Sequence, residues 1–365
     1  MINFDFELLS AIGLSEALAR RARDAADAEH DAGSGAALAL MRVTAVHRTT
    51  VQLHDGRAER SARVLPRLLR GDGGAALAVG DWALAGADGA GDLWLRARVE
   101  PSSHIARRDG DGSRHPIVSN VDCALLVMGL DDDFNLRRLE RYLSLVFASG
   151  VAPVVVLSKA DIAAANPHRR DAQVAQLRAR LPPGVEVVIV DGTDARSAAS
   201  FAHLTGFGRT LVVLGSSGAG KSTLTNTLLG AAVQDTGAVR VNDGRGMHTT
   251  TVRSLHRLSG GACIIDTPGL RTLRPDADEG ALLSSFADVA ALSLRCRFRD
   301  CAHGGEPGCA VRAEVDPDRL GNFQKMLREN RRDSLTWVER REQLSAWKSR
   351  GREARVRMRA KRGDG

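Results

Sequence analysis

One short segment of the chain has the spacing of a phosphate-binding loop. Its letters GSSGAGKS fit the pattern G-x-x-x-x-G-K-S, with an apolar stretch before them and a helical stretch after them. Glycines at these positions let backbone N–H groups converge on phosphates at the start of a helix. Lys221 would then reach the β- and γ-phosphates, and the Ser222 hydroxyl would ligate Mg²⁺. The predicted nucleotide-binding residues of this segment are Gly215, Ser216, Ser217, Gly218, Ala219, Gly220, Lys221, Ser222 and Thr223.

A second segment predicts that the bound base is guanine. Ser158, Lys159, Ala160 and Asp161 end the apolar run that begins at Val151. The Asp161 carboxylate can accept hydrogen bonds from both N1–H and N2–H₂ of guanine, whereas adenine offers neither donor, so an unpaired Asp161 would penalise ATP. The aliphatic part of Lys159 would lie along the base plane. The tripeptide DGT at 191–193, which ends the next apolar run, would lie against the base as a weaker element.

Two further segments could complete a site for a triphosphate and Mg²⁺. The tetrapeptide DTPG at 266–269 supplies Asp266, an acidic residue of the kind that holds Mg²⁺ through water. The segment GRGMHTTT supplies Thr249 and Thr250, either of which could ligate Mg²⁺ when the γ-phosphate is present. Leu270 stands where Ras-like GTPases carry the glutamine that orients the attacking water, so we expect hydrolysis to be slow until a partner assists it.

Four residues near the C-terminal end have the types and spacing of a structural zinc site. The pattern Cys296-x₄-Cys301-x-His303-x₅-Cys309 offers three thiolates and an imidazole, a ligand set that closes a tetrahedral zinc site. With no position left for water, one Zn²⁺ would stabilise a small domain and would not catalyse. An odd total of five cysteines argues against a disulfide framework. Cys123 and Cys263 lie within apolar strands and are interpreted as buried core residues.

The apolar pattern predicts the elements that position these residues. Short alternating segments from about residue 38 to 100 are typical of a small β-barrel. From 115 to 275, Val/Ile/Leu runs alternate with helical stretches, as in a parallel sheet covered on both faces. The predicted domains are an N-terminal extension or poorly ordered arm (1–35), an OB-type barrel that binds RNA (36–104), an α/β P-loop GTPase domain (105–275), a zinc-binding helical domain (276–335) and a basic helical tail (336–365).

Positive charge is concentrated at the end of the chain. The net charge is +7, and the segment 348–362 holds eight Lys/Arg against one Glu. Such a run can neutralise RNA phosphates, but it is equally consistent with a solvated tail. Trp94, Arg96 and Arg98 share one face of a predicted strand, which suits either RNA or solvent. The apolar runs are shorter than the ~20 residues that span a bilayer, so we expect a cytoplasmic protein without membrane contact. We also expect the protein to be a monomer.

The base-recognition segment precedes the phosphate loop, the reverse of the usual order in GTP-binding chains. If the two chain ends of a parallel-sheet domain lie close together, they can be joined and the chain opened at another loop without loss of the site. The loops that form the site still leave the same edge of the sheet. With this order, the chain closely resembles the circularly permuted GTPases, and among them the ribosome small-subunit-dependent (RsgA, or YjeQ) family. The resemblance covers roughly 38–330 and includes VGDW, SNVD, GRGMHTTT and CRFRDCAHGGEPGCAV, although Ser158 stands where the family usually has Asn or Thr.

The resemblance implies a GTPase that binds the immature small ribosomal subunit. It would bind GTP and GDP, and its barrel and zinc domain would contact rRNA. GTP hydrolysis would permit release, and small subunits would stimulate the slow hydrolysis. The family also suggests that His248 positions the catalytic water. Two alternatives remain open, namely a P-loop GTPase acting in tRNA modification or trafficking, and an RNA-binding zinc protein whose nucleotide is only a structural ligand.

Overall fold

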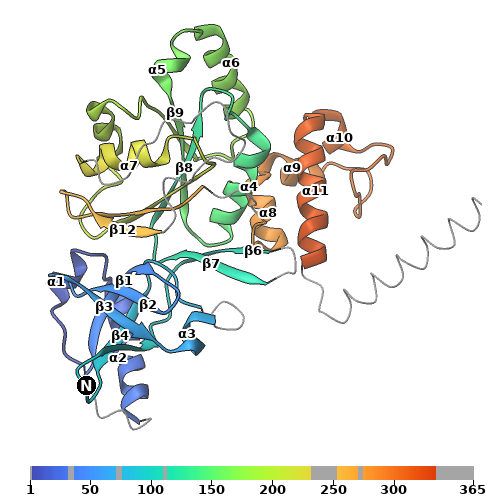
Figure 1. Ribbon diagram of the computed structural model, residues 1–365. Helices are drawn as coiled ribbons and strands as arrows, with labels where there is room; N and C mark the ends of the chain where they lie inside the picture. Colours follow the sequence, from blue (N-terminus) through green and yellow to red (C-terminus); the bar gives the residue numbers. More distant parts are fainter. Residues whose placement is uncertain are drawn as a thin grey trace, which may run out of the picture.

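The computed structural model describes residues 2–31, 37–70, 76–109, 113–231, 253–269 and 274–333. Figure 1 shows a barrel with its flanking helices at one end, a central sheet covered by helices, and a group of C-terminal helices beside that sheet. The predicted multidomain class is confirmed, with an OB-type barrel, an α/β P-loop domain and a helical domain that carries the Cys/His cluster. Among the described residues, no helix is long and apolar enough to cross a membrane.

The barrel is closed by five strands, which pair in the order β1-β2-β3-β5-β4. They are β1 (Ala39–Val46), β2 (Thr50–His54), β3 (Glu59–Val64), β4 (Trp82–Ala87) and β5 (Leu93–Arg98), with the short helix α3 (Pro66–Arg70) after β3. Strands β3 and β5 pair in parallel and the other pairs are antiparallel. Alternate side chains fill the interior, where Val43, Leu53 and Leu95 are fully buried. Closure leaves the barrel without an unpaired edge strand.

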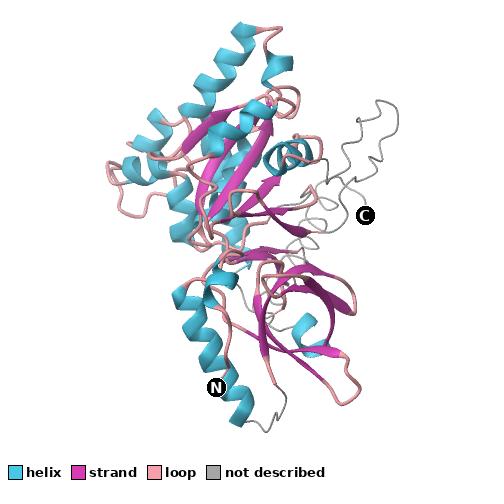
Figure 2. Cartoon of the chain, turned by 90° about the vertical axis from the view of Figure 1, so that its left-hand side faces the viewer, coloured by secondary structure: helices cyan, strands magenta, loops and turns pink. Residues whose placement is uncertain are grey.

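Two helices precede the barrel and pack against it, as Figure 2 shows. They are α1 (Phe6–Ser10), which Asp5 caps by accepting a hydrogen bond from the Leu8 N–H at 3.0 Å, and α2 (Glu16–Asp31). In α2, Leu18, Ala22 and other apolar residues at helical spacing are buried, and the helix lies against β4 and β5. Residues 2–31 therefore do not form a poorly ordered arm. Small alanine side chains let this helix approach the barrel closely.

Among the residues that the structure describes, the central sheet has six strands in the order β10-β9-β8-β11-β13-β12. They are β8 (Cys123–Gly129), β9 (Ala152–Ser158), β10 (Glu186–Ile189), β11 (Thr210–Gly215), β12 (Ser254–Arg257) and β13 (Cys263–Asp266). All pair in parallel except β12, which is antiparallel to β13. The hairpin of β6 (His104–Arg108) and β7 (Arg114–Ser119) lies between this sheet and the barrel.

Helices cover both faces of the central sheet, as the near-continuous apolar strands predict. In β8, Ala124, Leu126 and Met128 belong to one core cluster, whereas Leu125 and Val127 belong to the other. The elements that follow the strands are α4 (Leu136–Phe147), α5 (Ala160–Ala163), α6 (Pro167–Arg178), the 3₁₀ helix η2 (Ala195–Phe201) and α7 (Lys221–Leu229). Helix α4 begins after Asn135, whose side chain caps it by accepting from the Arg138 N–H at 2.9 Å.

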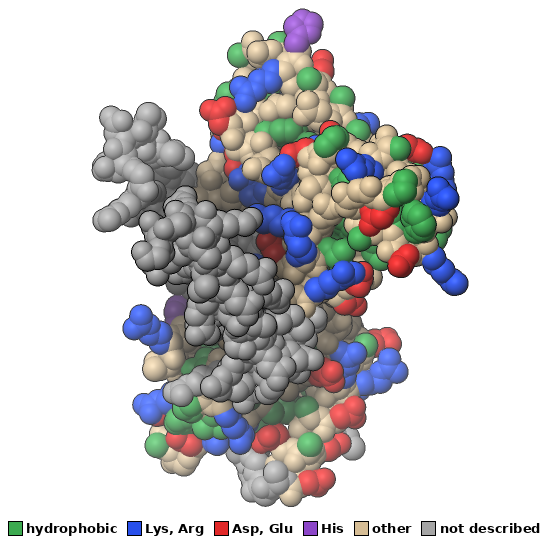
Figure 3. All heavy atoms as spheres, turned by 90° about the vertical axis from the view of Figure 1, so that its right-hand side faces the viewer, with side chains coloured by type: hydrophobic (Ala, Val, Ile, Leu, Met, Phe, Trp, Pro, Cys, Tyr) green, Lys and Arg blue, Asp and Glu red, His purple; other side chains and the backbone are tan. Residues whose placement is uncertain are grey.

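Within residues 274–333, the C-terminal domain has four helices around its own core. They are α8 (Glu279–Ser285), α9 (Ala287–Ser293), α10 (Ala310–Glu314) and α11 (Pro317–Asp333). Phe286 and Phe323 meet edge to face at 5.2 Å between ring centroids. The Lys and Arg side chains on the face that carries these helices are interspersed with acidic ones (Figure 3), and several are paired, such as Arg295 with Glu314 at 2.7 Å.

A buried ion pair joins the C-terminal domain to helix α4. Glu140 in α4 is 2% exposed and accepts a hydrogen bond from Arg319 in α11 at 2.7 Å. Burial raises the pKa of the Glu140 carboxyl, although the hydrogen bonds from Asn322 and Arg319 oppose this shift. Arg319 also donates to Asp288 in α9 at 2.6 Å. Losing either partner would leave a buried charge without compensation.

Arg42, a fully buried residue of β1, joins the barrel, the N-terminal helices and the central domain. Its guanidinium donates to the carbonyl oxygens of Gly80 at 3.4 Å and of Asn120 at 3.1 Å, and also to that of Ile12. The guanidinium carbon lies 5.7 Å from the centre of the Trp82 ring. One side chain thus satisfies three carbonyl groups from three parts of the chain.

We expect Arg42→Ala to destabilise the contact between these parts. The substitution leaves the buried carbonyl groups of Ile12 and Asn120 without this donor, whereas the Gly80 carbonyl keeps a hydrogen bond from the Asn120 side chain. At about 1 kcal/mol for each lost donor, the free energy of unfolding should fall by about 2 kcal/mol. Urea unfolding followed by circular dichroism measures this change. Arg63→Ala is the control, because Arg63 forms an exposed pair with Asp92 in the same barrel and should change stability by less than about 1 kcal/mol. Equal effects of the two substitutions would contradict the role of Arg42.

Candidate nucleotide-binding and metal-binding sites

The phosphate loop joins β11 to α7 at one edge of the central sheet. Gly218 and Gly220 have φ angles of 81° and 88°, a region that residues with a Cβ atom rarely adopt. Gly220 is the N-cap of α7, which begins at Lys221. The N–H groups in the first turn of a helix have no partner within the helix, so this loop has the geometry that binds anions.

The side chain of Lys221 is buried against the phosphate loop. The residue is 6% exposed, and its Nζ donates a hydrogen bond to the carbonyl oxygen of Ser216 at 2.6 Å. Burial lowers the pKa of Lys221, while the carboxylates of Asp266 and Asp133 act in the opposite direction. The two acidic residues therefore help to keep the ammonium group charged.

The base-recognition segment lies directly beside the phosphate loop. The Ser158 hydroxyl, at the end of β9, donates a hydrogen bond to the carbonyl oxygen of Ala219 at 2.6 Å, and both groups are buried. Lys159 follows with a φ of 60°, and α5 begins at Ala160. The Ser158 hydroxyl thus links the base-recognition segment to the phosphate loop.

The remaining base-side residues lie at the same edge. Asp161 is in the first turn of α5 and is exposed. The loop after β10 contacts both neighbours, because the Ala160 N–H donates to the carbonyl oxygen of Val190 at 3.2 Å and the Thr227 hydroxyl in α7 donates to that of Gly192 at 2.5 Å. The structure thus brings the base segment, the DGT loop and the phosphate loop together.

The DTPG segment completes this edge on the other side of the phosphate loop. Asp266 is fully buried at the end of β13, and the Thr267 hydroxyl donates to the carbonyl oxygen of Val213 in β11 at 2.7 Å. A Cβ atom added to Gly269 would lie 2.6 Å from the backbone nitrogen of Ser217. Gly269 therefore packs its backbone against the phosphate loop, a contact that only glycine permits.

Three predicted site residues lie outside the described ranges. These are His248 and the two threonines, Thr249 and Thr250, and the basic segment 348–362 is outside them as well. The sequence interpretation, conversely, missed Asp131 and Asp133, which follow β8 at the same sheet edge. Their signal was available, because three consecutive aspartates follow an apolar strand of the parallel sheet.

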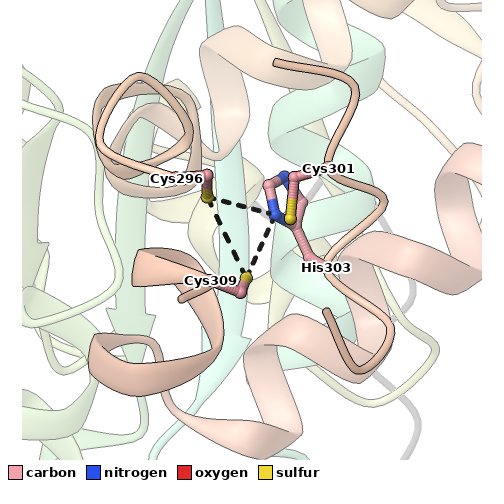
Figure 4. A group of neighbouring side chains, drawn as sticks. All are labelled: Cys296, Cys301, His303 and Cys309. Atoms are coloured by element: carbon pink, nitrogen blue, oxygen red, sulfur yellow. Dashed lines mark hydrogen bonds between the residues drawn. The ribbon is translucent and has the colours of Figure 1, made fainter. Parts of the chain in front are cut away.

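The four predicted metal ligands converge in the C-terminal domain. One ligand atom from each of Cys296, Cys301, His303 and Cys309 lies within 4.8 Å of all the others (Figure 4). The Cys309 Sγ lies 3.4 Å from the His303 Nδ1, and the Cys296 and Cys309 Sγ atoms are 4.0 Å apart. Tetrahedral zinc with bonds of about 2.0–2.3 Å would place its ligand atoms about 3.5–3.8 Å apart. The cluster could therefore hold a metal ion of this kind.

Hydrogen bonds hold the loop that carries these ligands. The Glu306 carboxylate accepts from the N–H groups of Ala302, Gly304 and Gly305, and these backbone bonds lower the pKa of Glu306 to about 2. Gln324 in α11 donates to the carbonyl oxygen of His303 at 2.8 Å, which ties the loop to the helical core.

The other two cysteines lie apart from the cluster. Cys123 and Cys263 are buried in β8 and β13, as predicted. Burial raises the pKa of the Cys123 thiol to about 12, so this group remains a neutral core side chain.

The strand order defines the class of protein. The strand that leads to Ser158 precedes the strand that leads to Gly215 in the chain, yet both lie beside β8 in one parallel sheet, and their loops meet. The fold and site are those of a circularly permuted P-loop GTPase. Residues 99–275 match the RsgA GTPase family, and the chain belongs to that family.

Curated relatives support the same assignment over most of the chain. A protein named small ribosomal subunit biogenesis GTPase RsgA, from Xanthomonas oryzae pv. oryzae (strain MAFF 311018), is 47% identical over 256 residues, which are 68% of each chain. A protein of the same name from Xanthomonas axonopodis pv. citri (strain 306) is 47% identical over 259 residues, 69% of each chain.

Two solved structures share the fold. The crystal structure of YjeQ from Thermotoga maritima superposes with a TM-score of 0.56 at 20% sequence identity, covering 80% of this chain and 98% of that one. YloQ, described as a circularly permuted GTPase, superposes with a TM-score of 0.54 at 22% identity, covering 82% and 97%.

We predict that Gly269→Ala weakens GTP binding about tenfold. The added Cβ atom meets the backbone of Ser217, which cannot swing aside as a side chain can, and overpacking of this kind costs ~1–3 kcal/mol. Titration with a fluorescent GTP analogue measures the affinity. Gly321→Ala in α11 is the control, because an added Cβ there meets no atom within 4 Å, so affinity should not change. If Gly269→Ala also binds normally, the packing of DTPG against the phosphate loop does not matter for binding.

Proposed function

We propose that this GTPase binds the small ribosomal subunit, contacts rRNA and couples GTP hydrolysis to late subunit maturation and to its own release. The proposal is supported most directly by the meeting of the base segment, phosphate loop and DTPG at one sheet edge, where the Ser158–Ala219 hydrogen bond joins the first two. The names of the relatives give the biological context.

In this proposal, each element of the site has one role. Asp161 reads the guanine edge, Lys159 lies along the base, and the loop from Gly215 to Thr223 binds the phosphates. Mg²⁺, bound with GTP, would neutralise developing phosphate charge and would be held by Ser222, by Asp266 through water, and by Thr249 or Thr250. His248 would position the attacking water.

The zinc cluster and the barrel serve binding to the subunit. One Zn²⁺ held by the three cysteines and His303 would fix the loop of the C-terminal domain that presents several arginines. In the barrel, Trp94 donates from its indole N–H to Asp88 at 2.9 Å and stacks with Arg63 at 5.7 Å. This aromatic and basic surface suits contact with RNA.

GTP hydrolysis with and without small ribosomal subunits tests the proposed function. We expect slow turnover of the protein alone and an increase of at least about tenfold on purified small subunits, because a partner must order the catalytic water. Asp161→Asn should lose activity with GTP and gain it with xanthosine triphosphate, since the amide can donate to the xanthine O2. The proposal fails if subunits do not stimulate hydrolysis. A nucleotide that stays bound without turnover would favour the structural-ligand alternative.

Metal content tests the zinc assignment. The wild-type protein should contain about one zinc per chain, and Cys301→Ser should lose it together with subunit binding, because a structural zinc supplies folding energy to its segment. Inductively coupled plasma mass spectrometry measures the metal. Cys123→Ala should keep its zinc, because Cys123 lies in the core of the central sheet. A full zinc complement in Cys301→Ser would disprove this ligand set.

A further inference from the structure

The loop between β8 and α4 contains three consecutive aspartates that lie in different environments. The side chains of Asp131 and Asp133 are 29% and 13% exposed, whereas that of Asp132 is fully exposed at 101%. Asp132 pairs with an exposed arginine, Arg169, at 3.1 Å. Two of the three carboxylates therefore turn toward the nucleotide edge of the sheet.

Asp131 contacts the base-recognition segment. Its Oδ2 accepts a hydrogen bond from the Lys159 Nζ at 2.6 Å. Partial burial alone would raise the pKa of Asp131, but hydrogen bonds from Lys159 and from the Asp133 N–H lower it overall. The carboxylate is thus ionised at neutral pH, and it holds the flexible lysine side chain in one conformation.

Asp133 contacts the phosphate loop. Its Oδ1 accepts a hydrogen bond from the Ser216 hydroxyl at 2.5 Å, and its Oδ2 accepts from the Gly129 N–H at 3.2 Å. The Arg138 guanidinium, at the start of α4, pairs with the same carboxylate at 2.5 Å. The carboxylate oxygens of Asp133 accept from these three donors, which fix both the position of the carboxylate and the direction of the Ser216 hydroxyl.

We propose that Asp131 and Asp133 are positioning residues that fix the position of Lys159, in the base-recognition segment, relative to the phosphate loop. One short loop holds Lys159 with one carboxylate and Ser216 with another, so neither half of the site can shift without moving the other. The inference rests on the nucleotide site of the proposed function. It adds that GTP affinity depends on two side chains outside the nucleotide motifs.

The exposed middle aspartate supplies a matched control for the experiment. Asp131→Ala, Asp133→Ala and Asp132→Ala are compared by titration with a fluorescent GTP analogue and by thermal unfolding. We expect the first two to lose about tenfold or more in affinity, the size of effect of one charge-assisted hydrogen bond, and Asp132→Ala to change it less than about twofold. Asp131→Ala should weaken GTP and inosine triphosphate equally, because Lys159 lies along the base and does not read its edge.

A double-substitution cycle distinguishes positioning from a general loss of stability. If Asp133 acts through the Ser216 hydroxyl, adding Ser216→Ala to Asp133→Ala should cost little further affinity. Asp133→Asn keeps an acceptor for Ser216, so it should recover part of the loss, and it carries the test if Asp133→Ala does not fold. The inference would be overturned if the affinity losses of Asp133→Ala and Ser216→Ala were additive. It would also be overturned if Asp131→Ala and Asp133→Ala both bound GTP with wild-type affinity. If the wild-type protein binds no GTP, the proposed function itself fails.

Discussion

The parallel alignment of β9, β8 and β11 is the constraint on which the rest of this structure depends. In the sheet register, Gly215 lies opposite Val127 and Ser158 lies opposite Gly129, so these strands end at one edge. Parallel strands require their loops to leave from the same edge, whatever the order of the strands in the chain. The permuted order therefore leaves the arrangement of these loops unchanged, and the Ser158–Ala219 hydrogen bond forms between segments some sixty residues apart.

Much of this organisation follows from the sequence, because its signals are local. The glycines of the phosphate loop are needed where φ is positive, and the buried strands are continuous apolar runs that indicate a parallel sheet. The four residues from Cys296 to Cys309 are close in sequence, so their spacing alone predicts that they converge. Motifs of this kind encode their geometry within a few residues.

The parts that the sequence did not reveal depend on contacts between distant segments. No local pattern indicates that Arg42 reaches the carbonyl group of Ile12 and that of Asn120, or that Glu140 pairs with Arg319 across a domain boundary. The inward turn of Asp131 and Asp133 depends on where Lys159 and Ser216 lie in the folded sheet. The order of α2 depends likewise on a distant contact, because its buried alanines pack against β4 and β5.

The permuted strand order also determines when the nucleotide site can form during synthesis. Strands β8, β9 and β10 are consecutive in the chain and adjacent in the sheet, so they can pair as soon as they leave the ribosome. The central strand β11 emerges later and must add to the exposed edge of β8, and β13 must then add to β11. The growing chain therefore carries its guanine-reading segment before it has any loop for phosphate. In an unpermuted GTPase the phosphate loop is made first and the base segment last, so here the two halves of the nucleotide site are made in the opposite order.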